Sequence, residues 1–313
     1  MNTPARLGAY VLGLAVVFGG AFGVGGAVGA TGPAPAKNSH GEHTPPSQAA
    51  QKTEHVPGGL QVSQSGYTLT PQTTTITPGT ETEFRFTVNG PDGRPVTAYQ
   101  TQHDKQLHLI VVSRDTTVFR HVHPELSGDG IWSVPLTLPD AGAYRIFADF
   151  APQGGEGLTL GADLYAAGDY APRPLPAPSR TVTVDGYTVR LDGTLIPGAA
   201  SRLTAEISRD GKPVTDLQPY LGAYGHLVAL RVGDLAYLHV HPDGAPGDGV
   251  TPAGPGITFY AEVPSRGDYR LFLDFQHDGT VRTAAFTVRA EQASGAVPTA
   301  TADHGSEHSH SGH

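Results

Sequence analysis

The sequence predicts two tandem antiparallel β-sandwiches, and three observations support this fold class. From residue 61 to residue 290, short runs of β-branched and aromatic residues alternate with turns rich in Gly and Pro, and helical periodicity is scarce. The order of these runs occurs twice, so the chain is a tandem duplication. Each copy has roughly 100 residues, the size of an immunoglobulin-like sandwich. We therefore expect an all-β protein with two tandem immunoglobulin-like antiparallel β-sandwiches and disordered termini.

Residues 1–30 are predicted to be a signal peptide or a membrane anchor. An uncharged apolar stretch follows Arg6, and Val28-Gly29-Ala30 offers the small residues that a signal peptidase prefers. At roughly 20 residues, the stretch is also long enough to span a bilayer if it is not cleaved. We expect an exported protein that is secreted, held at the cell surface or tethered to a membrane facing outward. Contact with a membrane is expected only through this segment.

The segments that flank the folded region are predicted to be disordered and to contain histidines. Residues 31–60 are rich in Pro, Ala, Ser and Gly and include three scattered histidines. Residues 291–313 end in His-x-His and His-x-x-His spacings, which bind divalent metals weakly in a flexible tail.

The first sandwich is predicted over 61–170 and the second over 181–290, with the Pro-rich residues 171–180 as a stiff linker. Besides a central hairpin, strands of the first copy are expected at 83–88, 131–138 and 144–150. Two further matches support the duplication: Gly93–Thr97 with Gly211–Thr215, and Ala143–Phe150 with Asp268–Phe275.

The composition limits the chemistry that the chain can perform. Cysteine is absent from the 313 residues and the only methionine is Met1, so disulfides, thiolate metal sites and a lipid-anchored export signal are excluded. Any metal must be held by nitrogen and oxygen. The net charge of −9, with few basic clusters, argues against nucleic acid as a partner.

A histidine pattern occurs once in each copy with the same spacing. His108 is followed thirteen residues later by His121-Val122-His123-Pro124, and His226 by His239-Val240-His241-Pro242. Two apolar runs around a polar turn separate the histidines in each copy, which indicates a β-hairpin.

The predicted register brings the imidazoles of each copy together. A turn centred between residues 114 and 115 places His108 opposite His121, and His123 shares their face because side chains two apart on a strand point the same way. A turn centred between residues 232 and 233 does the same for His226, His239 and His241. A one-residue bulge would move the histidines of one strand to the other face.

Three neutral imidazoles with an open coordination position suit Cu(II) or Zn(II), whereas Cu(I) would normally recruit sulfur. Other groups are candidates for a fourth ligand or for an acceptor of an imidazole N–H. These accessory candidates are Asp149, Asp274, Glu125, Asp243, His103 and His277.

Two alternatives to a protein that sequesters, buffers or delivers metal remain open. His108 shares its predicted face with Ile110 and Val112, so the histidines could belong to the core of a structural or adhesive β-sandwich protein. Alternatively, a cupin-like enzyme would use the open metal position. His-x-His on a strand is similar to the cupin motif, but Glu125 follows His123 by only two residues, closer than the cupin glutamate. No Ser-His-Asp order or nucleotide loop is present, so we expect no catalytic residue.

Three segments, Gln106–Asp115, Phe119–Pro124 and Tyr269–Phe275, resemble exported bacterial proteins of high-GC species that are identified as secreted or heavy-metal-associated. This resemblance implies metal handling. In fold class and ligand type, the copies also resemble the small copper-resistance sandwiches of the bacterial periplasm, which hold Cu(II) with histidine and aspartate.

The expected function is therefore extracytoplasmic binding of Cu(II) or Zn(II), for sequestration, buffering or delivery, with one site per copy. The expected partners are the metal ions and, for delivery, a metal transporter or a copper enzyme. Affinity is expected to fall as the pH drops through the imidazole pKa of about 6.5, because protonated imidazole cannot ligate.

Overall fold

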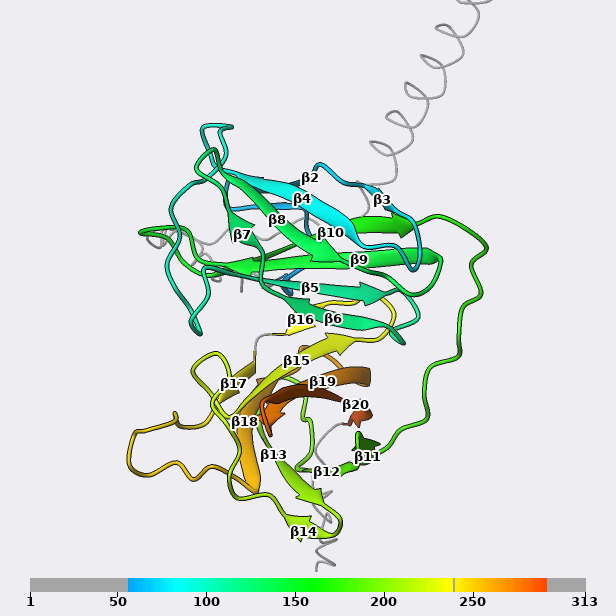
Figure 1. Ribbon diagram of the computed structural model, residues 1–313, viewed down its shortest axis with the longest axis vertical. Coiled ribbons are helices and arrows are strands. Elements are labelled where there is room, and N and C mark those ends of the chain that lie inside the picture. The colour runs from blue at the N-terminus through cyan, green and yellow to red at the C-terminus, as the bar shows by residue number, and fades with distance from the viewer. Residues whose placement is uncertain (1–55, 239, 292–313) are drawn as a thin grey trace, which may run out of the picture. The chain divides into compact units, whose positions relative to one another are not determined.

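The computed structural model describes residues 56–291, apart from His239 and the side chain of His241. These residues belong to one compact unit of the chain. Their regular secondary structure consists of β-strands (Figure 1), which confirms the all-β class. This part of the chain contains no helix of the length and hydrophobicity that a membrane crossing requires. The expected leader, the linker before residue 56 and the tail after residue 291 lie outside it.

The first sandwich consists of two sheets. One sheet has the order β1 (Ser63–Gln64), β2 (Tyr67–Pro71), β4 (Thr82–Asn89), β8 (Ile131–Leu136) and β7 (Glu125–Leu126). The other has the order β3 (Thr75–Ile76), β10 (Leu158–Ala166), β9 (Gly142–Phe150), β5 (Leu107–Ser113) and β6 (Phe119–Val122). All neighbours are antiparallel except β3 and β10.

The second sandwich repeats this plan. One sheet has the order β11 (Thr181–Val184), β12 (Tyr187–Asp192), β13 (Ala200–Arg209), β18 (Gly256–Glu262) and β17 (Val240–Pro242), with β14 (Lys212–Pro213) paired to β13. The other has the order β16 (Tyr237–Leu238), β15 (Gly225–Arg231), β19 (Gly267–His277) and β20 (Thr280–Ala290).

The topology of both copies is immunoglobulin-like. The order β2-β4-β8-β7 against β10-β9-β5 corresponds to the ABED and GFC sheets of an immunoglobulin domain, and the second copy has the equivalent strands in the same order. Each copy also contains a tyrosine corner. The hydroxyl groups of Tyr144 and Tyr269 each donate a 2.8 Å hydrogen bond to a carbonyl four residues earlier, on Asp140 and Ser265.

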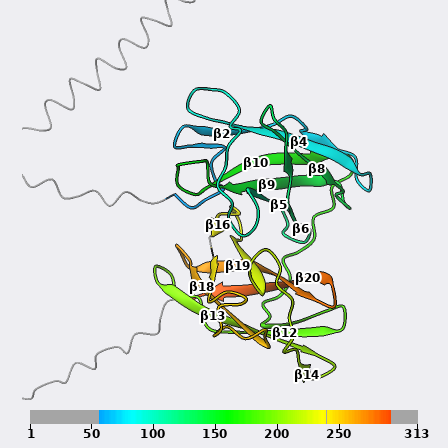
Figure 2. The same ribbon diagram turned by 60° about the vertical axis from the view of Figure 1, so that its left-hand side comes forward.

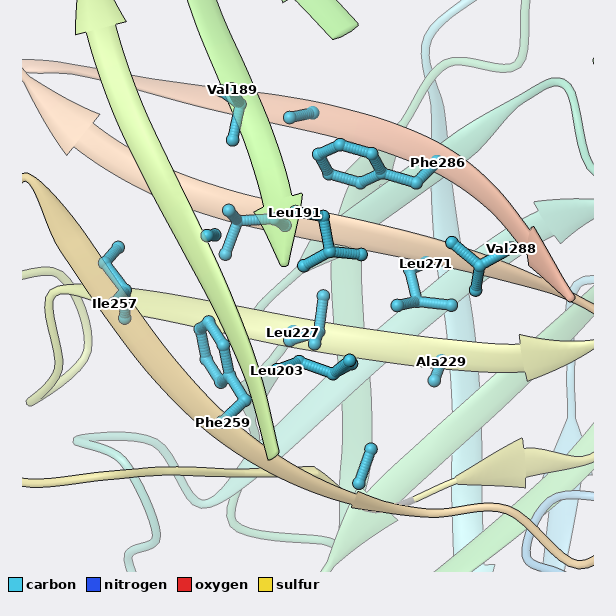
Figure 3. Close-up of a cluster of buried hydrophobic side chains, with 14 of the residues drawn as sticks. Val189, Leu191, Leu203, Leu227, Ala229, Ile257, Phe259, Leu271, Phe286 and Val288 are labelled. Atoms are coloured by element: carbon cyan, nitrogen blue, oxygen red, sulfur yellow. The ribbon is translucent and has the colours of Figure 1, made fainter. Parts of the chain in front are cut away.

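Each sandwich has its own apolar core between its two sheets, because alternate residues of each strand point inward. In the first copy, Trp132 stacks near Phe86 and its indole N–H donates to the hydroxyl of Tyr99. In the second copy, side chains from both sheets interdigitate (Figure 3), including Val189, Leu191, Leu203, Leu227, Phe259, Leu271 and Phe286.

The β5–β6 hairpin has a different register from the prediction, and its side chains nevertheless keep their predicted faces. Ile110, rather than His108, lies opposite His121. This is a shift of two residues. Because side chains alternate with a period of two, a shift of two leaves His108 and His121 on the same face of the sheet.

The register differs because both turns are centred one residue later than expected. In the first, Ser113 N donates to Val118 O at 3.0 Å, and the Ser113 hydroxyl donates to the Asp115 carboxylate inside the loop. In the second, Arg231 N donates to Ala236 O at 3.0 Å. Each turn is therefore a loop of four residues, 114–117 and 232–235, which polar groups within the loop hold closed.

The face of β5, β6 and β9 that carries the histidines packs against the second sandwich. Phe119, which opens β6, stacks on Phe272 of β19 with ring centroids 4.1 Å apart. Tyr237, which opens β16, lies 5.6 Å from the ring of Phe147 on β9. Phe119 and Tyr237 are equivalent residues of the two copies, as are Phe147 and Phe272, so the same contact is made in both directions, as in a two-fold dimer. Figures 1 and 2 label the strands that carry these residues, β6, β9, β16 and β19.

A short segment before β1 joins both copies, although the sequence assigns it to the disordered linker. Tyr237 N donates to Gly58 O at 2.9 Å, and Gly59 N donates to Thr159 O at 2.8 Å. Gly59 has a φ of +73°, and a Cβ there would lie 2.3 Å from the ring of Phe147. Only glycine fits this crossing, so the first ordered unit begins slightly earlier than predicted.

Candidate metal centre

Three of the predicted ligands lie together at one end of the hairpin. One nitrogen from each of His108, His121 and His123 lies within 4.8 Å of the other two. Their ring centroids are 4.9–5.3 Å apart. Three imidazoles around one tetrahedral ion, with metal–nitrogen distances of about 2.0–2.1 Å, have centroids about 5 Å apart. Among the described residues, which leave out His239 and the side chain of His241, this is the only such group of three or more histidines and carboxylates.

The hydrogen bonds of His108 and His121 fix which of their nitrogens hold lone pairs. His108 Nε2 lies 3.1 Å from the Gln102 carbonyl oxygen, which can only accept, so Nε2 carries the proton and Nδ1 the lone pair. His121 Nδ1 lies 2.8 Å from Asp274 Oδ2, so in the neutral ring it donates and Nε2 holds the lone pair.

These two lone-pair nitrogens face each other. His108 Nδ1 and His121 Nε2 are 3.1 Å apart. Two acceptors at this distance repel unless a proton or a cation lies between them. Two nitrogens bound to one tetrahedral zinc ion lie about 3.3 Å apart, so the observed spacing fits shared ligation.

His123 supplies the third nitrogen. Its Nε2 is buried and has no hydrogen-bond partner, whereas buried polar atoms are almost always paired. Its ring lies 5.0 Å from that of His108 and 4.9 Å from that of His121. One nitrogen of this ring lies within 4.8 Å of a nitrogen of each of the other two histidines, so His123 is placed as a third ligand.

Burial keeps the rings in the form that binds a metal. Burial, with added repulsion from His121, lowers the pKa of His108 and of His123 from 6.5 to about 3. Burial likewise lowers the pKa of His226 to about 4. These rings therefore stay neutral well below pH 7, so protonation of His108 and His123 is not expected to weaken binding near pH 6.5.

The second copy contributes to the same cluster. The His226 ring lies 6.4 Å from that of His121, and its Nε2 donates to the Tyr220 carbonyl oxygen at 2.8 Å. His103 is exposed beside the cluster, with its ring 6.2 Å from His108 and 5.4 Å from His226. The cluster is thus contiguous across both copies.

The predicted companions of His226 are not described in full. His239 lies outside the described residues, and only the backbone of His241 is described, paired with Tyr260 of β18. The second predicted trio therefore stays a prediction.

The accessory candidates differ in their positions. Asp274 belongs to the cluster through His121. Asp149 is the equivalent of Asp274 in the first copy. It accepts hydrogen bonds from Thr159 at 2.9 Å and from Tyr237 at 3.4 Å. Outside the three-histidine group lie exposed Glu125 and Asp243, and His277, which bonds to Tyr187 and Asp216.

Sequence reasoning missed the groups that orient the histidines. The carbonyl groups of Gln102 and Tyr220 stand six residues before His108 and His226, and backbone acceptors leave no mark in residue type. The exposed Thr283 hydroxyl, which donates to Asp274, was also missed. The equal spacing of Gln102 and Tyr220 from their histidines was the only available signal.

Comparisons with known proteins identify a family without an assigned activity. A family model described as Domain of unknown function (DUF8832) matches residues 61–165 and again residues 182–292. A search of curated proteins found no match to this sequence.

Solved structures with some similarity include bacterial adhesins. The Escherichia coli adhesin FdeC is 14% identical over 72% of this chain and 65% of that chain, with a TM-score of 0.24. The Yersinia pseudotuberculosis adhesin InvE is 14% identical over 73% and 60%, also with a TM-score of 0.24. The chain spans less than two thirds of either structure. TM-scores this low do not establish a shared fold.

Proposed function

The chain belongs to the family described as Domain of unknown function (DUF8832), and we propose that it is an exported protein that binds Cu(II) or Zn(II) through His108, His121 and His123. The observation that supports this most directly is the 3.1 Å separation of His108 Nδ1 and His121 Nε2, which both hold lone pairs when the two rings are neutral. One nitrogen of His123 lies within 4.8 Å of the nitrogens of the other two histidines, and the Nε2 of this ring is buried without a hydrogen-bond partner among the described residues.

The ligand set favours these two ions. Three imidazoles without thiolate or thioether suit Cu(II) and Zn(II) better than Cu(I), and the chain has no cysteine. We propose a binding role, for sequestration, buffering or delivery, rather than catalysis. Delivery would require a metal transporter or a copper enzyme as partner. The resemblance to heavy-metal-associated exported proteins agrees with this role.

Metal content tests the proposal. We expect His123→Ala to lose one bound ion per chain and to remain folded in EDTA, because no hydrogen bond of its Nε2 is lost. Both proteins should carry alanine at His304, His308, His310 and His313, which removes weak binding by the tail. The measurement is elemental analysis after dialysis against excess Zn²⁺ or Cu²⁺. Equal metal content in the two proteins would rule out the site.

A structural role for the same histidines is the second candidate. His108, His121 and His226 each have a hydrogen-bond partner without any metal, which suits polar groups that join two sandwiches of a structural or adhesive protein. The reported structural neighbours are adhesins, and their low TM-scores leave the choice to experiment.

Thermal unfolding with and without EDTA separates the two candidates. Metal binding to the folded state stabilises it by about 2.7 kcal/mol when the free metal concentration is 100 times Kd. The melting temperature then rises. A purely structural cluster would give the same melting temperature in Zn²⁺ and in EDTA.

A further inference from the structure

We propose that the metal site is shared between the two sandwiches, with Asp274 of the second copy positioning His121 of the first. On this proposal a bound ion clamps the copies together. The inference rests on the proposed metal function. It adds a positioning residue, Asp274, and the expectation that metal binding stabilises the docked arrangement of the two copies.

Asp274 is placed for this role by the duplicated fold. It lies on β19 directly opposite His226 of β15, as Asp149 lies opposite His108 in the first copy. Yet Asp274 Oδ2 accepts from His121 Nδ1 of the other copy at 2.8 Å, with both side chains nearly buried, 4% and 6% exposed. The carboxylate therefore reaches across the interface to a ligand.

Both carboxylate oxygens of Asp274 accept a hydrogen bond. Oδ2 accepts from His121, and Oδ1 accepts from the hydroxyl of Thr283 at 2.5 Å. No Arg or Lys within residues 56–291 forms an ion pair with Asp274. Its negative charge is buried and directed at the imidazole cluster, where it favours a cation.

A carboxylate on the outer nitrogen of a ligating histidine has a known effect. It fixes the tautomer, holds the ring in place and makes the other nitrogen a better donor to the metal. Here it directs the lone pair of His121 Nε2 toward His108 and His123. Removing such an acceptor typically weakens metal binding about 10–100-fold.

The clamp follows from linkage. Because Asp274 of the second copy holds His121 of the first, metal binding at His121 favours the docked arrangement of the two copies. Docking then favours metal binding to the same extent. The amide of Tyr237 reports docking, because it donates to Gly58, whose neighbour Gly59 bonds to the first copy. Its hydrogen exchange should slow when metal binds.

The test compares wild type with Asp274→Asn in the full chain, with the tail histidines replaced in both proteins. Asp216→Asn is the matched control, because it removes an Asp–His contact of 3.1 Å, to His277, outside the cluster. The readouts are Zn²⁺ affinity by chelator competition, the d–d absorption of bound Co²⁺, and exchange of the Tyr237 amide with and without Zn²⁺.

We expect Asp274→Asn to bind Zn²⁺ about 10–100-fold more weakly and to alter the Co²⁺ spectrum. Asp216→Asn should match wild type in both. Zinc should slow exchange at Tyr237 in wild type and less in Asp274→Asn at the same concentration. If Asp274→Asn fails to fold, Thr283→Val tests the same contact by removing only the donor to Asp274, and a smaller loss of affinity is expected.

The outcomes separate the two proposals. If wild type binds zinc and Asp274→Asn has the same affinity and Co²⁺ spectrum, the shared site is overturned and the metal function stands. Weaker binding without any zinc effect on Tyr237 exchange overturns the clamp. If wild type binds no metal at the cluster, the proposed function fails and this inference fails with it.

Discussion

Phe272→Ala is expected to lower the free energy of unfolding by about 3–5 kcal/mol, the typical cost of truncating a buried phenylalanine. Phe272 is 2% exposed and stacks on Phe119 with the rings nearly parallel, 6° apart. Truncation removes this stack and leaves a cavity between the sandwiches. The measurement is urea unfolding at neutral pH in EDTA, so that metal does not contribute.

Phe272→Ala should also weaken Zn²⁺ binding at the cluster, because Phe272 and Asp274 lie on the same face of β19. Tyr165→Ala is the control, since that side chain is 52% exposed and lies away from the interface core. We expect the control to change stability by less than about 1 kcal/mol. An equal loss in both variants would show that the interface stack contributes little.

Acid should destabilise the metal-free protein below about pH 6.5, because its buried histidines are neutral when folded and take up protons when the chain unfolds. The folded pKa values are about 3 for His108 and His123 and about 4 for His226, below the unfolded value of 6.5. Between these values the unfolded chain binds more protons, so unfolding becomes easier as the pH falls. The contribution of these histidines to the free energy of unfolding is therefore fully present above about pH 6.5 and declines toward pH 3.

The slope of this decline identifies its source. A histidine that stays neutral in the folded protein and is protonated in the unfolded chain contributes at most about 1.4 kcal/mol per pH unit. Urea unfolding across this range, in EDTA, should show a shallower slope for His123→Ala than for wild type. Identical slopes would mean that His123 titrates normally in the folded protein.

The sequence was sufficient for the fold class and for bringing His108, His121 and His123 together. Duplicated strand patterns and turn residues predict two all-β copies, because each pattern reflects local backbone preference and one buried face. The turn of the first hairpin was predicted one residue too early. His108 and His121 still share a face, since a displacement of two residues does not change which side of a strand a side chain occupies.

The identity of the surface facing the histidines was not predictable. The sequence places His108 and Ile110 on one apolar face, and this pattern is the same whether the face covers a core or meets another domain. In the structure, Ile110 contacts the second copy, and the chain brings Asp274 to His121 across 153 positions of sequence.

The sequence by itself determined two all-β copies with the same succession of strand patterns, and three imidazoles on one sheet face. Alternation along a strand and the closing of a short turn are local, so residue order is enough to specify them. Only the tertiary structure decided that His226 and Asp274 of the second copy join that cluster. Docking depends on how two whole faces fit, and side chains far apart in sequence determine that fit together.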